Sequence, residues 1–277
     1  MRFRIVALDI DGTLLNSQGE LPPENAEAVR KTTELGVQII LVTGRRFSTA
    51  KRIAENLNLD SPLVTHNGAL IRFPFLEERL ASWFLSPETA SLVLRSVPDL
   101  LTYAVLHSDK PPAGQLTVHS RSRDNLPLRS YLEKVPQSVR EVDSLESLLD
   151  EDLIQIMFSG ELGPIQRIES SLIELGHCGI LRLSKTYYPS KNIGILDVLH
   201  KHCSKGNALA YLSRRYDCPP DQIVAIGDNH NDLEMLEFAG LGVVMANCVD
   251  ELKNRGFRET ASNDESGVAR ALQDYVW

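Results

Sequence analysis

Four short apolar runs in this sequence each end abruptly in a cluster of Asp, Asn, Thr or Gly residues. The runs lie at Ile5–Leu8, 37–42, Leu63–Thr65 and 223–226. They are continuous rather than alternating, which is typical of strands buried on both faces of a parallel sheet. Helical patterns lie at 22–35, 47–57, 206–216 and 231–239. This alternation predicts an α/β fold, a doubly wound parallel sheet with helices on both faces.

The middle of the 277-residue chain has a different texture. Between about residues 83 and 190 the apolar runs are shorter and prolines interrupt them. We therefore predict an inserted α+β domain at 83–190, whereas residues 1–82 and 191–277 together form the core domain. A chain of this length is long enough for two modest domains with hydrophobic interiors of their own.

The overall charge limits the range of partners. The formal net charge is −8, which argues against nucleic acid as a partner because nucleic-acid binding normally requires a basic surface. A small phosphorylated molecule is compatible with this charge if a cation sits in the site. No stretch approaches the roughly 18 apolar residues of a membrane span, and the four cysteines show no paired spacing. These features predict a soluble, cytoplasmic protein that does not contact a membrane.

The polar clusters are expected to meet, because the carboxyl ends of parallel strands share one edge of a sheet. Asp9 and Asp11 are two residues apart in an extended segment, so their side chains can point the same way. Gly12 then allows a tight turn. Asp228 and Asp232 add two more carboxylates. Converging carboxylates either have raised pKa values or share a divalent cation, and an all-oxygen site favours Mg²⁺.

Four motifs follow one another along nearly the whole chain: DIDGTLL at 9–15, TGR at 43–45, SKGNAL at 204–209 and GDNHND at 227–232. In content and order they resemble the motifs of the haloacid dehalogenase superfamily of phosphohydrolases. Within that superfamily the chain is most similar to the Cof-type branch of sugar-phosphate and related phosphatases. The resemblance implies the same doubly wound core. The insertion between the second and third motifs is similar to the cap domain of that branch, which closes over the active site and sets substrate specificity.

The resemblance implies a mechanism built on Asp9. Asp9 would attack phosphorus and become an aspartyl phosphate, and Asp11 would protonate the leaving oxygen and later activate water. Lys205 would neutralise the phosphoryl group and help to orient Asp9. Thr43 and the backbone N–H of Gly44 would bind the phosphoryl oxygens.

The resemblance also implies a bound Mg²⁺ ion next to these groups. Its ligands would be Asp9, the backbone carbonyl of Asp11, and Asp228. Asp232 would support this metal site mainly from outside the direct ligands. Asn231, in the same motif, would lie near the phosphate and contribute to substrate binding.

Other polar residues have competing interpretations. Arg45 closes the second cluster and either reaches the substrate, caps a helix or pairs with an acid. Asn67, at the end of the third run, is a candidate substrate contact. Two further groups lie elsewhere: a soft-metal site or ordinary polar residues at His200, His202 and Cys203, and an anion-recognising or simply solvated loop at Arg121 and Arg123.

We therefore expect an enzyme, a magnesium-dependent phosphomonoester hydrolase that acts on small phosphorylated metabolites such as sugar phosphates. One alternative is a phosphosugar mutase or phosphotransferase that uses the same aspartyl-phosphate chemistry. Another is a non-catalytic phospho-receiver, against which Asp11 argues because a receiver needs no acid for a leaving group. The expected partner is a small-molecule phosphate ester, and the chain is expected to act as a monomer or small homo-oligomer.

Overall fold

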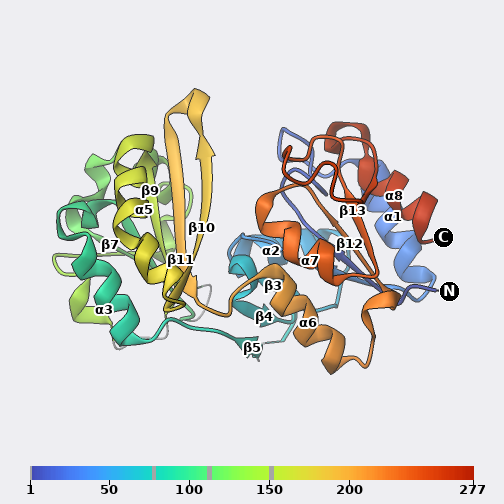
Figure 1. The fold of residues 1–277 in the computed structure, drawn as a ribbon, viewed down its shortest axis with the longest axis horizontal. Helices are drawn as coiled ribbons and strands as arrows, with labels where there is room; N and C mark the ends of the chain where they lie inside the picture. Colours follow the sequence, from blue (N-terminus) through green and yellow to red (C-terminus); the bar gives the residue numbers. More distant parts are fainter. Residues whose placement is uncertain (1, 77–78, 111–113, 150–152) are drawn as a thin grey trace. The chain divides into compact units, whose positions relative to one another are not determined.

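The chain divides into two compact units, which are drawn in Figure 1. The computed structural model describes residues 2–76, 79–110, 114–149 and 153–277. The core unit comprises Met1–Ala81 and Ser204–Trp277, and the inserted unit comprises Ser82–Cys203.

The second boundary between the units falls at Ser204 and not at residue 191. The difference comes from β11 (Ile193–His200), which pairs along its length with β10 (Leu181–Tyr188) and with most of β9 (Leu153–Glu161). These hydrogen-bonded neighbours keep β11 within the inserted unit.

The core unit contains a five-stranded sheet in which every pair of neighbours is parallel. In spatial order its strands are β14 (Arg258–Glu259), β13 (Leu241–Val244), β12 (Ile223–Gly227), β1 (Ile5–Leu8) and β2 (Gln38–Leu41). In β1, Ile5 is aligned with Ile223 on one side and with Gln38 on the other. The chain continues outward in opposite directions from β1 and β12. Their carboxyl ends therefore flank a topological switch point, where α/β sheets usually bind ligands.

Helices cover both faces of this sheet, as expected from the alternating pattern. They are α1 (Pro23–Glu34), α2 (Phe47–Asn56), α6 (Lys205–Arg215), α7 (Leu233–Phe238) and α8 (Gly267–Tyr275). Figure 1 shows α1 and α8 side by side, on the other side of the sheet from α6 and α7. A buried cluster joins the strands to α1 and α8 through side chains that include Val6, Val29 and Leu272. The helix α1 follows Pro22 and ends before Gly36, whose φ of 84° suits glycine.

The apolar run 63–65 forms a strand, but this strand is not a full member of the parallel sheet. Strand β3 (Leu63–Thr65) touches the sheet through a single bridge between Val42 and Val64. It pairs antiparallel with β4 (Leu70–Arg72), and β5 (Arg79–Ser82) follows in the same three-stranded sheet. The short 3-10 helix η1 (His66–Gly68) reverses the chain between β3 and β4.

The inserted unit is α+β. Its six-stranded sheet has the order β10-β11-β9-β6-β7-β8, with β6 at Ala104–Ser108, β7 at Gln115–His119 and β8 at Val139–Val142. Helices α3 (Pro87–Ser96) and α5 (Leu162–His177) share one buried cluster with the sheet, whereas α4 (Leu126–Leu132) belongs to another. The pairs are antiparallel apart from β7 and β8.

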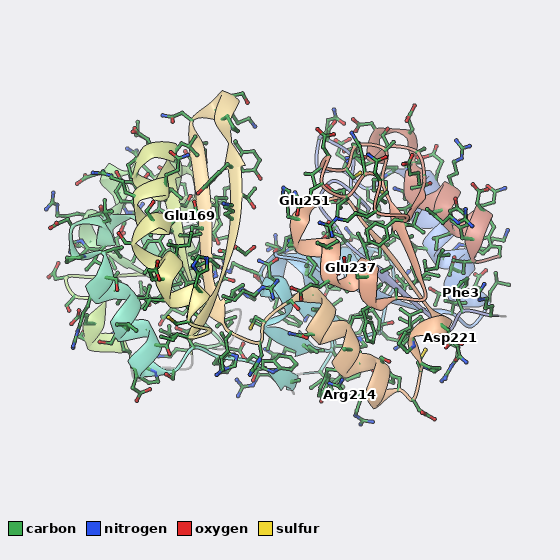
Figure 2. All side chains as sticks on the ribbon, in the orientation of Figure 1. Phe3, Glu169, Arg214, Asp221, Glu237 and Glu251 are labelled. Atoms are coloured by element: carbon green, nitrogen blue, oxygen red, sulfur yellow. The ribbon has the colours of Figure 1, made fainter. Side chains whose placement is uncertain are left out.

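The surface of the core unit is strongly charged. Figure 2 labels Arg214, Asp221, Glu237 and Glu251, all of which are exposed, whereas Phe3 is buried. Among the helices of the described ranges, none has both the length and the apolar composition required to cross a bilayer.

Candidate active site

The first motif forms a sharp turn directly after β1. The backbone N–H of Asp9 donates to the carbonyl of Ile226 at 3.0 Å, which fixes Asp9 at the edge between β1 and β12. Gly12 follows with a φ of 79°. A Cβ atom at Gly12 would lie 2.4 Å from Oδ2 of Asp228, so the turn can pass this carboxylate only if residue 12 is glycine.

Three carboxylates converge next to this turn. One oxygen from each of Asp9, Asp228 and Asp232 lies within 4.8 Å of the others, and the residues are 4 %, 8 % and 0 % exposed. Burial raises the pKa of Asp9 well above its ordinary value, and the carboxylates of Asp232 and Asp228 add to the effect although Lys205 opposes it. Burial and Asp232 likewise raise the pKa of Asp228 to about 7. A hard divalent cation would favour the ionised forms, so these oxygen donors fit Mg²⁺.

A single buried ammonium group connects two of these carboxylates. Ser204 caps α6 by accepting from the backbone N–H of Asn207 at 3.0 Å, and Lys205 is therefore the first residue of the helix. Its Nζ donates to Oδ1 of Asp9 and to Oδ1 of Asp232, each at 2.5 Å. Burial alone would lower the pKa of Lys205, but Asp232 and Asp9 outweigh burial and raise it. The ammonium therefore stays charged.

Asp232 and Asp228 also accept hydrogen bonds from neighbouring donors. Oδ2 of Asp232 accepts from the backbone N–H groups of Asp228 and Asn229 at 2.9 Å. The hydroxyl of Thr13, which is fully buried, donates to Oδ1 of Asp228 at 2.7 Å. No role was predicted for Thr13, although it belongs to the DIDGTLL motif at 9–15.

The side chain of Asp11 has a different partner. Arg45 donates to both of its oxygens, from Nε to Oδ2 at 2.7 Å and from Nη2 to Oδ1 at 2.5 Å. The side chain of Asp11 is 59 % exposed and that of Arg45 is 30 % exposed. The hydrogen bonds to Asp11 raise the pKa of Arg45. Of the three interpretations of Arg45, pairing with an acid is therefore the one that this structure displays.

The second and third clusters lie against each other. Thr43 is 1 % exposed, donates its backbone N–H to Val64 at 2.8 Å and accepts at Oγ1 from the N–H of Arg45 at 3.1 Å. The N–H of Asn67 donates to the carbonyl of Thr43 at 3.0 Å. The amide of Asn231 donates to Oδ1 of Asn67 at 2.9 Å. A polar chain thus links the end of β2 to the last motif.

The two groups of candidate residues at 121–123 and 200–203 belong to the inserted unit. The rings of His200 and His202 lie 5.3 Å apart. Arg121 faces Asp124, and Arg123 donates to Glu141 at 2.6 Å. Exposed ion pairs of this kind are typical of solvated loops.

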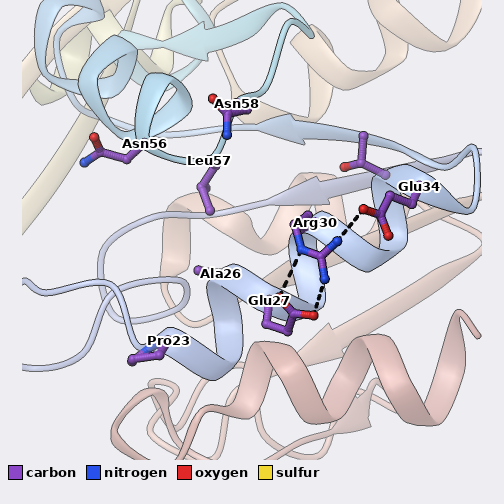
Figure 3. Close-up of a pocket in the computed structure, with 9 residues that line it drawn as sticks. Pro23, Ala26, Glu27, Arg30, Glu34, Asn56, Leu57 and Asn58 are labelled. Carbon is purple, nitrogen blue, oxygen red and sulfur yellow. Dashed lines mark hydrogen bonds and ion pairs between the residues drawn. The ribbon is translucent and has the colours of Figure 1, made fainter.

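A surface groove of about 450 Å³ also lies in the core unit, next to α1 (Figure 3). Its lining includes Ala26, Leu57 and Asn58, and the guanidinium of Arg30 is paired there with Glu27 and Glu34. None of the carboxylates of the candidate site lines this groove.

Known proteins resemble this chain along its full length. A family model described as haloacid dehalogenase-like hydrolase matches residues 6–272. Bacillus subtilis YxeH is 28 % identical over 285 residues, which cover 99 % of this chain and 98 % of YxeH. The 5-amino-6-(5-phospho-D-ribitylamino)uracil phosphatase YitU of the same organism is 27 % identical, with coverages of 98 % and 97 %.

The fold comparison agrees. A crystal structure of a haloacid dehalogenase-like hydrolase from Bacteroides thetaiotaomicron matches with a TM-score of 0.82 at 22 % identity, covering 98 % of this chain and 99 % of the other. The family model spans nearly the entire sequence, and the motif residues of the core unit meet in one site. The chain therefore belongs to the haloacid dehalogenase-like hydrolases and is an enzyme of the phosphatase type found in that family.

Proposed function

We propose that this enzyme is a magnesium-dependent phosphomonoesterase that hydrolyses small phosphorylated metabolites, with sugar phosphates as the leading class, through an aspartyl-phosphate intermediate. The main support is the buried contact of Lys205 with Asp9 and Asp232, next to Asp228. It combines a fixed carboxylate, a permanent positive charge and oxygen donors for a cation, as phosphoryl transfer requires.

In the first step, Asp9 attacks phosphorus. Lys205 donates to Oδ1 of Asp9, and the other oxygen of the carboxylate is left to attack the incoming ester. The new bond joins this oxygen to phosphorus while the bond from phosphorus to the ester oxygen breaks. The proton of the Asp11 carboxyl moves to that leaving oxygen, a transfer that typically contributes about 10²–10⁴-fold.

In the second step, Asp11 accepts a proton from water, and the resulting hydroxyl oxygen attacks phosphorus. The aspartyl phosphate breaks, Asp9 is regenerated and inorganic phosphate leaves. The fork of Arg45 pairs with the ionised carboxylate of Asp11 and orients it to accept the proton of water in the second step. In the first step Asp11 leaves this pair to carry the proton that it donates.

Asp9, Asp228 and the backbone carbonyl of Asp11 would hold Mg²⁺. When bound, the ion supplies electrostatic stabilisation for the charge on the transferring phosphoryl oxygens. Both oxygens of Asp232 already accept hydrogen bonds from protein groups, so its task is to fix Lys205 and the backbone at Asp228. The hydroxyl of Thr43, the N–H of Gly44 and the amide of Asn231 bind the phosphoryl oxygens.

The substrate class receives support from a relative. YitU is named for a substrate that carries a phosphorylated ribityl chain. A panel of sugar phosphates, phosphorylated polyols and nucleotide monophosphates therefore tests the proposal, with free phosphate as the readout. Isomerised hexose phosphate without free phosphate would instead establish the mutase. A stable phosphoprotein, with no magnesium-dependent turnover of p-nitrophenyl phosphate, would establish the receiver.

Removal of divalent cations is expected to make stability depend on pH. Burial and Asp232 raise the pKa of Asp228 to about 7, whereas an aspartate in an unfolded chain has a pKa of about 3.9. Between these values the folded state keeps a proton that the unfolded state has lost. The free energy of unfolding in EDTA should therefore fall as pH rises from about 4 to about 7.

Thermal unfolding with EDTA or MgCl₂ at pH 5 and pH 8 checks this expectation. Bound Mg²⁺ favours ionised carboxylates, so the increase in Tm on adding MgCl₂ should be larger at pH 8. The Asp228→Asn variant should lose most of this difference. An equal increase at both pH values in the wild type would contradict the assignment of Asp228 to the cation.

Replacement of Arg45 should reduce turnover. In Arg45→Ala the carboxyl of Asp11 loses its two-pronged partner, and kcat with p-nitrophenyl phosphate is expected to fall by about 10–100-fold, part of the contribution of a general acid. Arg45→Lys keeps a positive charge but lacks the two-pronged fork, so its kcat should lie between those of the wild type and Arg45→Ala. Arg30→Ala removes another ion-paired arginine of the core unit and should leave kcat unchanged. If both alanine variants behave like the wild type, Arg45 does not orient Asp11.

A further inference from the structure

The turn between β3 and β4 has an unusual backbone. His66 and Asn67 are consecutive residues with φ values of 50° and 54°, and Gly68 follows with 100°. Side chains other than glycine seldom adopt this left-handed region, and two in succession are rarer still. Both residues are also buried, at 3 % and 6 % exposure. Backbone strain of this kind persists only when the surrounding structure fixes it, and it is concentrated at functional sites.

The backbone of this turn contacts two of the motifs. The N–H groups of His66 and Asn67 donate to the carbonyls of Arg45 and Thr43, each at 3.0 Å. A Cβ atom at Gly68 would lie only 2.2 Å from the carbonyl oxygen of Ser204, the residue that precedes Lys205. The turn therefore packs directly against the second motif and against the start of α6.

The side chain of Asn67 contacts the remaining phosphate-binding groups. Its Oδ1 accepts from the amide of Asn231 at 2.9 Å. A Cβ atom at Gly44 would lie 2.9 Å from the same oxygen, so the Gly44 peptide rests against this carboxamide. The side chain of Asn67 thus lies against both Gly44 and Asn231.

We infer that Asn67 is a positioning residue, and that it acts on the phosphoryl group through Asn231 and Gly44 and not by direct contact. This inference rests on the proposed function. The left-handed backbone brings the carboxamide between the two groups, and the hydrogen bond from Asn231 fixes the direction of that amide. Loss of the carboxamide should weaken phosphate binding in the ground state and in the transition state alike, and such a loss raises KM while changing kcat little.

A double-mutant cycle tests the inference. Asn67→Gly removes the carboxamide but tolerates the positive φ. We expect KM for p-nitrophenyl phosphate and the inhibition constant of inorganic phosphate to rise by about tenfold, as for other contacting pairs. In an Asn231→Ala background the same change should cost much less, because its target is gone. Asn58 also has a left-handed φ, of 53°, and lines the groove in Figure 3, so Asn58→Gly is a matched control without effect.

A second variant separates positioning from direct contact. Asn67→Asp keeps an acceptor for Asn231 and tolerates the left-handed backbone, so its KM and its inhibition constant for phosphate should lie between those of the wild type and Asn67→Gly. If Asn67→Asp binds phosphate more weakly than Asn67→Gly, the new carboxylate repels the phosphate itself, and this result would overturn the inference. Full additivity with Asn231→Ala, or wild-type constants for Asn67→Gly, would also overturn it. If the wild type itself releases no phosphate, the proposed function fails instead.

Discussion

Asp9→Asn is expected to abolish phosphate release, with a loss in kcat of at least about 10³-fold, as for other covalent nucleophiles. The amide nearly matches the carboxylate in shape but cannot form an acyl phosphate under these conditions. The substitution also leaves Lys205 with its second partner, Asp232, so the buried ammonium keeps a counter-charge. Activity should disappear without loss of the fold.

Stability measurements distinguish this result from unfolding. Burial raises the pKa of Asp9, so its ionisation favours the unfolded state as pH rises above the ordinary aspartate value. Asparagine has no such ionisation. In EDTA at pH 7 the variant should therefore unfold at the same temperature as the wild type or at a higher one, and MgCl₂ should raise its Tm by less. Phosphate release by Asp9→Asn at the rate of the wild type would refute the mechanism.

Lys205→Met is expected to damage both activity and stability. Lys205 is 2 % exposed, and its ammonium is the charge shared by Asp9 and Asp232. Methionine fills similar space but leaves the two buried carboxylates without a positive charge beside them. Removal of one partner from a buried ion pair costs about 3–5 kcal/mol. Urea unfolding in EDTA measures this loss. Phosphatase activity should fall to background, because the phosphoryl charge also loses its counter-ion.

The pH dependence of Lys205→Met identifies the cause. The ammonium of Lys205 lowers the pKa of Asp9, so its removal lets this pKa rise further, and the variant should regain stability as the pH is lowered towards 5. Lys253→Met removes an exposed lysine that pairs with Asp250 and should leave urea unfolding unchanged. A Lys205→Met protein as stable as the wild type at pH 8 would show that this ion pair contributes no net stability.

The central strands of the core unit could be predicted from the sequence because they are buried on both faces. Continuous apolar runs such as Ile5–Leu8 need no knowledge of their neighbours to be recognised. In the inserted unit, β10 is mostly only partly buried, and β11 alternates between partly buried and buried residues over most of its length. They therefore lack such a run, and the sequence placed the boundary at residue 191, before β11.

The candidate site was likewise predicted only in part from the sequence. The motifs predicted Asp9, Lys205 and Asp228 as site residues because their residue types and order are distinctive, and the structure places these side chains close together. The sequence did not reveal that Asn231 donates to Asn67 or that Thr13 donates to Asp228, because these partners are 164 and 215 positions apart along the chain. Such contacts depend on side-chain rotamers and loop geometry that no local pattern records. Arg45 had three plausible partners until the turn at Asp11 was known.

The position of β1 between β2 and β12 has a consequence for biosynthesis. Ile5 pairs with Ile223, so a ribosome delivers this strand long before one of its two neighbours, and the whole inserted unit is translated in between. Nascent β1 therefore has an unpaired apolar edge until β12 is made, and contacts so distant along the chain are slow to form. Asp9, the proposed nucleophile, is therefore made well before the residues of β12 that complete its surroundings.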